Sequence, residues 1–298
     1  MKAVQLHGYG GVDQLRYEDV PDPKPGPGEV LVRVAATSVN PIDWKIRAGY
    51  LKDRMPLQFP VILGRDVAGE IAEDAGRWRK GQKVLGLANR TYAELVNVPA
   101  DVLASLPDGL EERQAGALPL VLTTGAQLME AVRPEAGQTV LVTGALGNVG
   151  RTAVYVARQR GARVIAGVLA RQKPKALSLG ADRIIATDSD DEIQGLPELD
   201  AIADTVGEPL VAKLIEKLRP GGTLGSVLGR PKSAEGKQIR VEAILAHADA
   251  MLLHRLADAV RKGELDIPVA RTFSLKDAAQ AQALAEQGGV DGKVVLLP

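Results

Sequence analysis

Residues 139–168, TVLVTGALGNVGRTAVYVARQRGARVIAGV, decide the fold. The stretch reads as an apolar strand, a glycine-rich turn, a helix and a second apolar strand. Gly144, Gly147 and Gly150 give the turn the spacing GxxGxxG. This spacing lets the chain turn tightly and presents backbone N–H groups to a pyrophosphate at the helix N-terminus. The stretch therefore predicts a dinucleotide-binding βαβ unit, and the alternative is a tight turn of the same kind that binds nothing.

The segment EERQAGALPLVLTTGAQLMEAV (111–132), before this unit, reads as a helix. Further strands and helices alternate after the unit, beginning with a Lys- and Leu-rich helix that follows RVIAGV (163–168). The segments RIIATD (183–188), LDAIADTV (199–206) and GGTLGSVLG (221–229) read as strands separated by helices. Alternation of this kind indicates right-handed βαβ units on a parallel sheet. Before residue 100 the predicted secondary structure differs. Segments such as EVLVRVAATSV (29–39) read as strands, and they are separated by residues rich in glycine and proline. The sequence predicts an α/β fold: a Rossmann doubly wound parallel sheet with an all-β first part.

Composition narrows the class of function. The chain has 298 residues, with 37 Lys and Arg against 37 Asp and Glu, so no net field draws it to nucleic acid or to a membrane. We expect a small-molecule partner. No apolar run approaches about 18–20 residues and the start has no signal-like core, which favours a cytoplasmic location. The chain has no cysteine and only three histidines, without an HxxxH or HExxH pair, so we expect no metal site.

The charge that follows the second strand of the unit bears on the cofactor. Enzymes that use NAD place a carboxylate about 20 residues after the glycine turn, on the ribose 2′-hydroxyl. Residues 151–181 contain no Asp or Glu, and LARQKPK (169–175) carries Arg171, Lys173 and Lys175 instead. Guanidinium and ammonium groups bind a 2′-phosphate, which a carboxylate would repel. The sequence predicts NADPH rather than NADH; the alternative is a solvated basic helix start.

Several motifs occur in a family order. They are SVNPIDWKIRAGY (38–50), PVILGRDVAG (60–69), RKGQKV (79–84), TYAEL (91–95), LGAD (179–182), LRPGG (218–222) and GKVVL (292–296). The whole chain resembles the medium-chain dehydrogenase/reductase superfamily, and its first two motifs resemble the zinc-independent, zeta-crystallin-like quinone oxidoreductase branch. The resemblance implies a GroES-like catalytic domain at 1–118 and 247–298, and a Rossmann NADP-binding domain at 119–246.

Departures from the zinc alcohol dehydrogenases agree with the scarcity of metal ligands. Those enzymes have cysteine in the place of Asn40 and a Gly-His-Glu motif in the place of Gly64, Arg65 and Asp66. Without zinc, no Lewis acid lowers the pKa of an alcohol. The resemblance therefore implies hydride transfer from NADPH to an electron-poor acceptor, either a quinone or an α,β-unsaturated carbonyl.

The resemblance also assigns residues to the site. The expected catalytic group is Asn40, Asp43, Lys45 and Tyr50. The nicotinamide and its ribose would lie beside Asn40, Pro41, Asp43 and Thr123, and the pyrophosphate would face the turn at Gly144, Gly147, Asn148 and Val149. The adenosine phosphate would be surrounded by Gly167, Val168, Arg171, Lys175 and Thr187, and the carboxamide held by Leu228 and Gly229.

Alternatives stay open for several of these residues. Lys45 could equally be a solvated charge and Tyr50 a rim aromatic. Asp43 could form an ion pair with Arg47, and Asp66 reads as a buried carboxylate satisfied by backbone donors. The family often has tyrosine where this chain has Thr187, which weakens the NADPH prediction. His247 and His254 are expected at the surface, seven residues apart on one face of one helix.

The sequence also allows two other functions, and it predicts an assembly. The chain could be a non-catalytic NADPH-binding protein of the crystallin kind, or an enoyl-thioester reductase with a long acyl channel. Family members commonly form homodimers by pairing edge strands of their Rossmann sheets. Because an apolar edge strand needs covering, the segment QIRVEAIL (238–245) predicts a homodimer.

Overall fold

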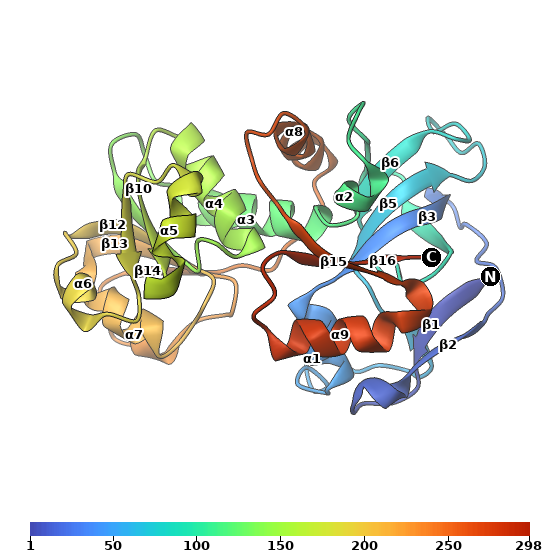
Figure 1. Cartoon of the computed structure of the whole chain (residues 1–298), viewed down its shortest axis with the longest axis horizontal. Helices are drawn as coiled ribbons and strands as arrows, with labels where there is room; N and C mark the ends of the chain where they lie inside the picture. The colour runs from blue at the N-terminus through green and yellow to red at the C-terminus, as the bar shows by residue number, and fades with distance from the viewer. The chain divides into compact units, whose positions relative to one another are not determined.

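A computed structural model describes residues 1–298, and the chain forms two compact units (Figure 1). Unit 1 contains Met1–Leu120 and Ala248–Pro298, and unit 2 contains Val121–His247. The C-terminal segment thus returns to the unit in which the chain begins.

Unit 2 is built on a six-stranded sheet in which every neighbouring pair of strands is parallel. The strand order is β11-β10-β9-β12-β13-β14. This doubly wound order confirms the predicted fold class. The strands are β9 (Thr139–Thr143), β10 (Arg163–Val168), β11 (Arg183–Ala186), β12 (Leu199–Asp204), β13 (Leu218–Ser226) and β14 (Arg240–Ala243).

Helices cover both faces of this sheet because alternate strand residues point to opposite sides. Val140 and Val142 of β9 share a core with α3 (Pro119–Val132), α4 (Asn148–Gln159) and the short α5 (Lys173–Ala176). Leu141, between those two valines, packs in a second core with α6 (Asp190–Gln194) and α7 (Leu210–Leu214). The apolar strands of residues 139–168 are therefore buried on both sides, as their sequence predicts.

Unit 1 is mainly β. Its larger sheet has the order β15-β16-β3-β5-β6-β8, with β7 also paired to β3, and its smaller sheet has the order β2-β1-β4. The last strand of the chain pairs antiparallel with β3, so that Val294 lies opposite Val39. The strands are β1 (Lys2–Leu6), β2 (Leu15–Asp19), β3 (Glu29–Val39), β4 (Val61–Ile62), β5 (Asp66–Ile71), β6 (Lys83–Leu87), β7 (Leu95–Pro99), β8 (Leu103–Ser105), β15 (Val269–Ser274) and β16 (Lys293–Leu297).

The expectation that the first hundred residues are all β was wrong at one place. Directly after β3 the chain forms the helix α1 (Pro41–Arg47). Pro41 suits a first helical position, and the Asp43 carboxylate accepts the Asn40 backbone N–H at 2.8 Å, which is half of a capping box. The other helices of unit 1 are α2 (Glu112–Ala115), α8 (Ala250–Arg261) and α9 (Ala278–Gln287).

Three helix predictions need correction. The helix expected over 111–132 breaks between α2 and α3, because Gly116 packs against Ala36 and Pro119 starts a new helix. The helix expected after residue 170 is mostly 3₁₀ turns around α5. His247 precedes α8, whose N-cap is Asp249, so the two histidines do not share a helix, although both are exposed as expected. The 3₁₀ turns are Val12–Gln14, Ala170–Gln172, Leu177–Leu179, Ile215–Lys217, Lys232–Ala234 and Leu275–Asp277.

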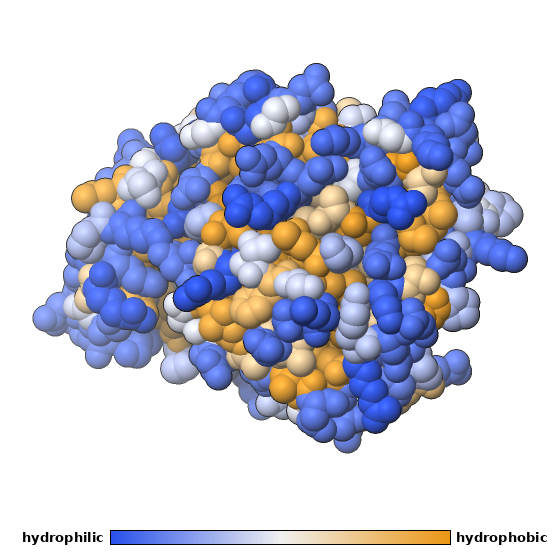
Figure 2. Space-filling model, turned by 45° about the vertical axis from the view of Figure 1, so that its right-hand side comes forward, coloured by the Kyte–Doolittle hydropathy of each residue, from blue (hydrophilic) through white to orange (hydrophobic).

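The surface mixes polar and apolar groups. Figure 2 shows hydrophobic side chains reaching the surface between hydrophilic ones. Tyr50, Leu245 and Met251 are the most exposed large apolar or aromatic side chains apart from Leu177. None of the helices is long and apolar enough to cross a membrane.

Candidate functional site

The glycine turn of unit 2 lies between β9 and α4. Gly144 has a left-handed φ of 57°, and Gly147 is the N-cap of α4 with no side chain to satisfy the first turn of the helix. A Cβ atom at Gly150 would lie 2.8 Å from Ala145 Cα and closer still to the Gly144 carbonyl oxygen. The turn therefore brings two backbone segments into direct contact and leaves helix N–H groups open to an anion.

The turn sits at the carboxyl edge of the parallel sheet, which Asp204 holds together. The Asp204 carboxylate accepts the Thr143 hydroxyl at 2.9 Å and the Ser226 hydroxyl at 2.8 Å. It also accepts the backbone N–H groups of Val206 and Gly207. One buried carboxylate thus joins the ends of β9, β12 and β13. Ligands of doubly wound sheets bind at this edge, and sequence reasoning missed the residue that orders it.

Buried polar atoms without partners test whether a dinucleotide fits. Thr123 is fully buried and its hydroxyl has no hydrogen-bond partner, and the side-chain oxygen of Asn148 is likewise buried and unpartnered. Buried polar groups are normally satisfied. Asn148 follows the exposed Gly147 in the turn. Two unsatisfied groups among the residues predicted to bind the cofactor fit a polar ligand such as a nicotinamide dinucleotide.

The predicted adenosine-phosphate residues lie at the ends of β10 and β11. Arg171 is exposed and has no ion pair, whereas Lys173 donates to both oxygens of Glu192 at 2.8 Å. Asp188 brings a carboxylate to the same loop, where it accepts the Ala170 N–H at 2.8 Å. Both acidic groups lie outside residues 151–181 and follow β11, the parallel strand adjacent to β10.

The remaining predicted residues of unit 2 follow the same edge. Thr187 donates its hydroxyl to the Val168 carbonyl at 3.2 Å, and its methyl group would lie 2.9 Å from a Cβ at Gly167. Leu228 is 49% exposed, and Gly229 has a left-handed φ of 96°. The Leu228 N–H already donates to the Ser226 hydroxyl at 3.2 Å, so the predicted carboxamide contact would use other backbone groups of Leu228 and Gly229.

Unit 1 places Asn40 in a buried polar network. The Asn40 side-chain oxygen accepts from Lys293 Nζ at 2.5 Å, and its amide nitrogen donates to Asp66 at 2.7 Å. Asp66 is fully buried and also accepts the Ser38 hydroxyl and the Leu120 N–H. The expectation that Asp66 is a buried structural carboxylate agrees with this geometry, but most of its donors are side chains rather than backbone groups.

Asp43 lies in the first turn of α1, three residues after Asn40, and is buried beside Tyr92. Its carboxylate accepts the Asn40 N–H at 2.8 Å and the Tyr92 hydroxyl at 2.9 Å. Burial raises the pKa of the Asp43 carboxyl to about 6, although both hydrogen bonds lower it. Burial, with the nearby Asp43 charge, raises the pKa of the Tyr92 hydroxyl well above its usual range.

Asp43 predicts a pH effect on stability. Between pH 3.8 and about 6 the folded chain binds a proton on Asp43 that the unfolded chain releases, so this group makes the fold less stable as pH rises through that window. The rise to about 6 corresponds to about 3 kcal/mol. Most of this change falls between pH 4 and pH 7, so over that range Asp43→Asn should gain about 2 kcal/mol of stability relative to the wild type. Urea unfolding of both proteins at the two pH values checks this; a constant difference would contradict it.

Lys45 and Tyr50 gather around one aromatic ring. Lys45 Nζ lies 5.6 Å from the centre of the Trp44 ring, and the Tyr50 ring meets Trp44 edge-on at 6.3 Å. Tyr50 is 72% exposed. Both side chains are therefore outside the buried network, where an acceptor could reach them.

The alternative ion pair between Asp43 and Arg47 does not form. Arg47 is almost fully buried and donates to Gln282 at 2.9 Å and to the Gly10 carbonyl at 2.5 Å, and it pairs with Glu286. Gln282 and Glu286 belong to α9, which packs against α1 in unit 1. Arg47 therefore pairs with Glu286, which is 239 positions away in sequence, and not with the nearby Asp43.

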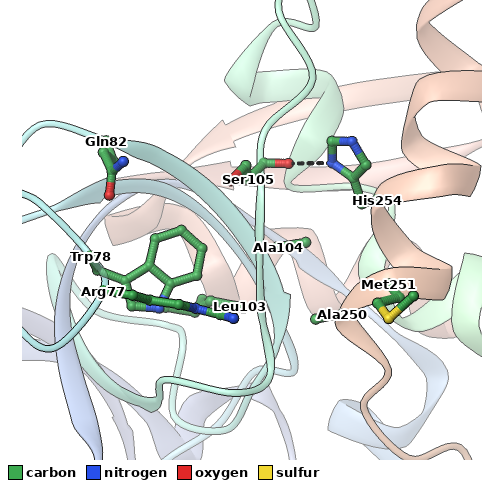
Figure 3. Close-up of a pocket in the computed structure, with 9 residues that line it drawn as sticks. All are labelled: Arg77, Trp78, Gln82, Leu103, Ala104, Ser105, Ala250, Met251 and His254. Carbon is green, nitrogen blue, oxygen red and sulfur yellow. Dashed lines mark hydrogen bonds between the residues drawn. The ribbon is translucent and has the colours of Figure 1, made fainter.

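A surface depression of about 520 Å³ lies elsewhere in unit 1. Figure 3 shows its lining, in which His254 contacts the Ser105 carbonyl oxygen at 2.9 Å and Met251 lies on the same side. The Arg77 guanidinium lies 4.9 Å from the centre of the Trp78 ring. None of the predicted site residues lines this depression.

The chain is similar in sequence and in fold to several known proteins. A family model described as an alcohol dehydrogenase GroES-like domain matches residues 26–108, and one described as a zinc-binding dehydrogenase matches residues 179–296. The solved structure of the quinone oxidoreductase from Coxiella burnetii has a TM-score of 0.89 and 30% identity, over 100% of this chain and 99% of that one. Quinone-oxidoreductase QR1, chloroplastic, of Triphysaria versicolor is 28% identical over 100% of this chain and 98% of that protein.

A third relative differs in the substrate that its name states. An acryloyl-coenzyme A reductase of Sulfurisphaera tokodaii is 26% identical over the full length of both chains. The fold and these matches define an oxidoreductase that uses a nicotinamide cofactor. The chain belongs to the medium-chain dehydrogenase/reductase superfamily, which confirms the resemblance seen in its motifs.

The sequence motifs did not indicate three residues that the structure places at these positions: Asp204 at the edge of the unit 2 sheet, and Tyr92 and Lys293 in the buried polar network of unit 1. One signal was available for Lys293, since it is the only charge in the apolar closing strand KVVLL. A lysine there is either at an exposed strand end or buried with partners, and only the pairing of β16 with β3 decides between them.

Proposed function

We propose that this chain is an NADPH-dependent reductase that delivers hydride, without zinc, to a quinone or an α,β-unsaturated carbonyl. The observation that carries the proposal is the setting of Asn40. At the place where the zinc enzymes have a cysteine, this chain has an amide held between Lys293 and Asp66. These side chains provide a fixed ammonium instead of metal ligands. The description of one matching family model names zinc, so zinc independence needs its own test.

The residues of the chain would place the reactants and exclude water. When bound, the nicotinamide supplies the hydride. The turn from Gly144 to Gly150 would hold the pyrophosphate, and Thr123 and Asn148 would use their unpartnered polar atoms on the cofactor. Lys45 and Tyr50 would donate hydrogen bonds to the acceptor oxygen as its negative charge grows.

Steady-state assays test the proposal. The protein should oxidise NADPH in the presence of quinones and short enones. The rate should be unchanged after dialysis against a chelator, and added Zn²⁺ should not increase it. Absence of NADPH oxidation with every electron-poor acceptor would refute reductase activity. Loss of activity on chelation, restored by Zn²⁺, would refute zinc independence. Tight NADPH binding without turnover would favour the non-catalytic alternative.

An enoyl-thioester substrate is the second candidate, because a full-length relative is described as an acryloyl-coenzyme A reductase. Acryloyl-coenzyme A belongs in the same acceptor panel. If its kcat/KM exceeds those of free quinones and enones by tenfold or more, the thioester is the better substrate class.

Arg171 carries the preference for NADPH. Lys173 is already paired with Glu192, and Asp188 adds a negative charge to the loop, so the exposed Arg171 is the cation best placed to bind a 2′-phosphate. A charge-assisted hydrogen bond contributes about 1.5–3 kcal/mol, so Arg171→Ala should weaken NADPH binding about tenfold or more and leave NADH binding unchanged. Lys173→Ala is the matched control with a smaller effect. Titration of cofactor fluorescence measures both; an unchanged NADPH-to-NADH ratio in Arg171→Ala would reject the charge argument.

We also propose a homodimer formed through β14, the edge strand of the unit 2 sheet. The Ile244 N–H donates to Ser226 of β13, so the N–H of Ala243, one residue earlier, points to the open edge. Proline at an edge position removes an outward donor without disturbing the inner ladder. Ala243→Pro should therefore produce a monomer by light scattering, and Ala243→Val should stay dimeric. A dimeric Ala243→Pro protein would place the interface elsewhere.

A further inference from the structure

The C-terminal strand delivers one buried cation to the candidate site. Lys293 is 3% exposed, and it begins β16 directly opposite the end of β3, where Asn40 follows Val39 (Figure 1). Its ammonium lies 2.5 Å from the Asn40 side-chain oxygen, 3.4 Å from Asp66 and 3.5 Å from the Val39 carbonyl. Three oxygens therefore face the three donors of the ammonium.

This arrangement gives the Asn40 amide a single orientation. Lys293 can only donate hydrogen bonds and the Asp66 carboxylate can only accept them. The amide oxygen must therefore face Lys293, and the amide nitrogen must face Asp66. An asparagine between two acceptors or two donors could adopt either orientation of its amide. Here one neighbour donates to the amide oxygen and the other accepts from the amide nitrogen.

Fixing Asn40 also fixes the start of α1. Asn40 is the N-cap residue of this helix, and its backbone N–H donates to Asp43 in the first turn. The same helix carries Trp44 and Lys45, and Tyr50 follows it and contacts the Trp44 ring. A small rotation of Asn40 would therefore move the side chains that we expect near the acceptor.

We infer that Lys293 is a positioning residue of the reductase site, acting through the Asn40 amide. The inference rests on the proposed function for its kinetic effect but not for its structural one. Lys293 supplies a donor at a set place; it neither touches the acceptor nor exchanges a proton with it. Its contribution should depend on the presence of the Asn40 amide.

A double-mutant cycle in the full-length protein tests this dependence. Lys293→Met removes the donor with little change in volume and should lower kcat about tenfold, with KM for NADPH changed less than threefold. Lys293→Gln restores a donor without charge and should return kcat to within threefold of the wild type. In an Asn40→Ala background, neither substitution should lower kcat further. Lys262→Met, which removes an exposed lysine of α8 paired with Asp258, is the control.

Trp44 gives a readout that needs no turnover. It is half-buried, whereas the other tryptophan, Trp78, is 5% exposed, so acrylamide reports mainly on Trp44. Lys293→Met should change its quenching constant, the change should be absent in the Asn40→Ala background, and Trp44→Phe should abolish the signal. If the wild type reduces no acceptor, the proposed function fails and this quenching cycle alone decides the inference.

Additive effects of Lys293→Met and Asn40→Ala on kcat would overturn the inference, and so would a wild-type kcat in Lys293→Met. If the wild type shows no turnover, additive effects on the quenching constant would overturn it instead. If Lys293→Met does not fold, Lys293→Gln takes its place in the cycle. Any change that Lys293→Gln produces must then disappear in the Asn40→Ala background, and a change that persists there would equally overturn it.

Discussion

Gly150→Ala should abolish tight dinucleotide binding. The added Cβ would lie 2.8 Å from Ala145 Cα and closer to the Gly144 carbonyl oxygen, and real Cβ atoms do not approach backbone so closely. Helix α4 would have to move away from the turn, and with it the N–H groups that face the pyrophosphate. We expect NADPH and NADH affinity to fall together by about a hundredfold, which is about 2.7 kcal/mol.

A matched substitution separates this effect from a general loss of stability. Gly195 ends α6 with a φ of −75°, and its nearest neighbour to an added Cβ is the Asp191 carbonyl oxygen at 3.3 Å. Gly195→Ala should bind NADPH with wild-type affinity. Cofactor fluorescence titration measures both variants, with circular dichroism to show that they are folded. Wild-type affinity in folded Gly150→Ala would mean that the turn does not hold the cofactor.

Asp66→Ala should strongly destabilise unit 1. The substitution removes the acceptor of Ser38, Asn40 and the Leu120 N–H, and it leaves Lys293 buried without its counter-charge. Removing one partner of a buried ion pair typically costs about 3–5 kcal/mol. Both tryptophans lie in unit 1, so their fluorescence during urea unfolding reports on this unit.

The asymmetry of the network sharpens the test of Asp66. Without Lys293, Asp66 keeps three neutral donors, whereas without Asp66 the ammonium keeps only an amide and a carbonyl oxygen. Asp66→Ala should therefore cost more than Lys293→Met. Asp74→Ala, which removes a carboxylate that accepts the Lys80 N–H at an exposed turn, should cost less than about 1 kcal/mol. Equal losses for Asp66→Ala and Asp74→Ala would show that the buried pair does not stabilise the unit.

Local patterns predicted the elements that depend on neighbouring residues. The glycine spacing at Gly144, Gly147 and Gly150 predicted a turn that the structure contains, because tight turns and close helix packing are decided within a few residues. The strand over 29–39 was predicted with the bounds that β3 has. The helix over 111–132 failed at Gly116, where a contact with Ala36 of a distant strand overrides helical propensity.

The charge around the loop after β10 likewise depends on residues that are distant in sequence. The stretch 151–181 has no acidic residue, yet Asp188 and Glu192 reach the loop after β10 because parallel pairing sets β11 beside it. The charge around a possible 2′-phosphate is therefore a property of two strand ends rather than one. Arg171 has no ion pair in that loop. The prediction for 2′-phosphate binding therefore narrows from a basic segment to this one residue.

The sequence by itself determined the superfamily, the doubly wound sheet, the glycine turn and the scarcity of metal ligands, because each of these is written in residue type and short-range spacing. Only the tertiary structure decided the partners of the buried polar groups. Lys293 meets Asn40 across 253 residues, and Arg47 meets Glu286 across 239. Such pairs form because β16 pairs with β3 and α9 packs against α1. Because an unpaired buried charge is costly, each buried charge is paired with a polar or oppositely charged group that this packing brings close.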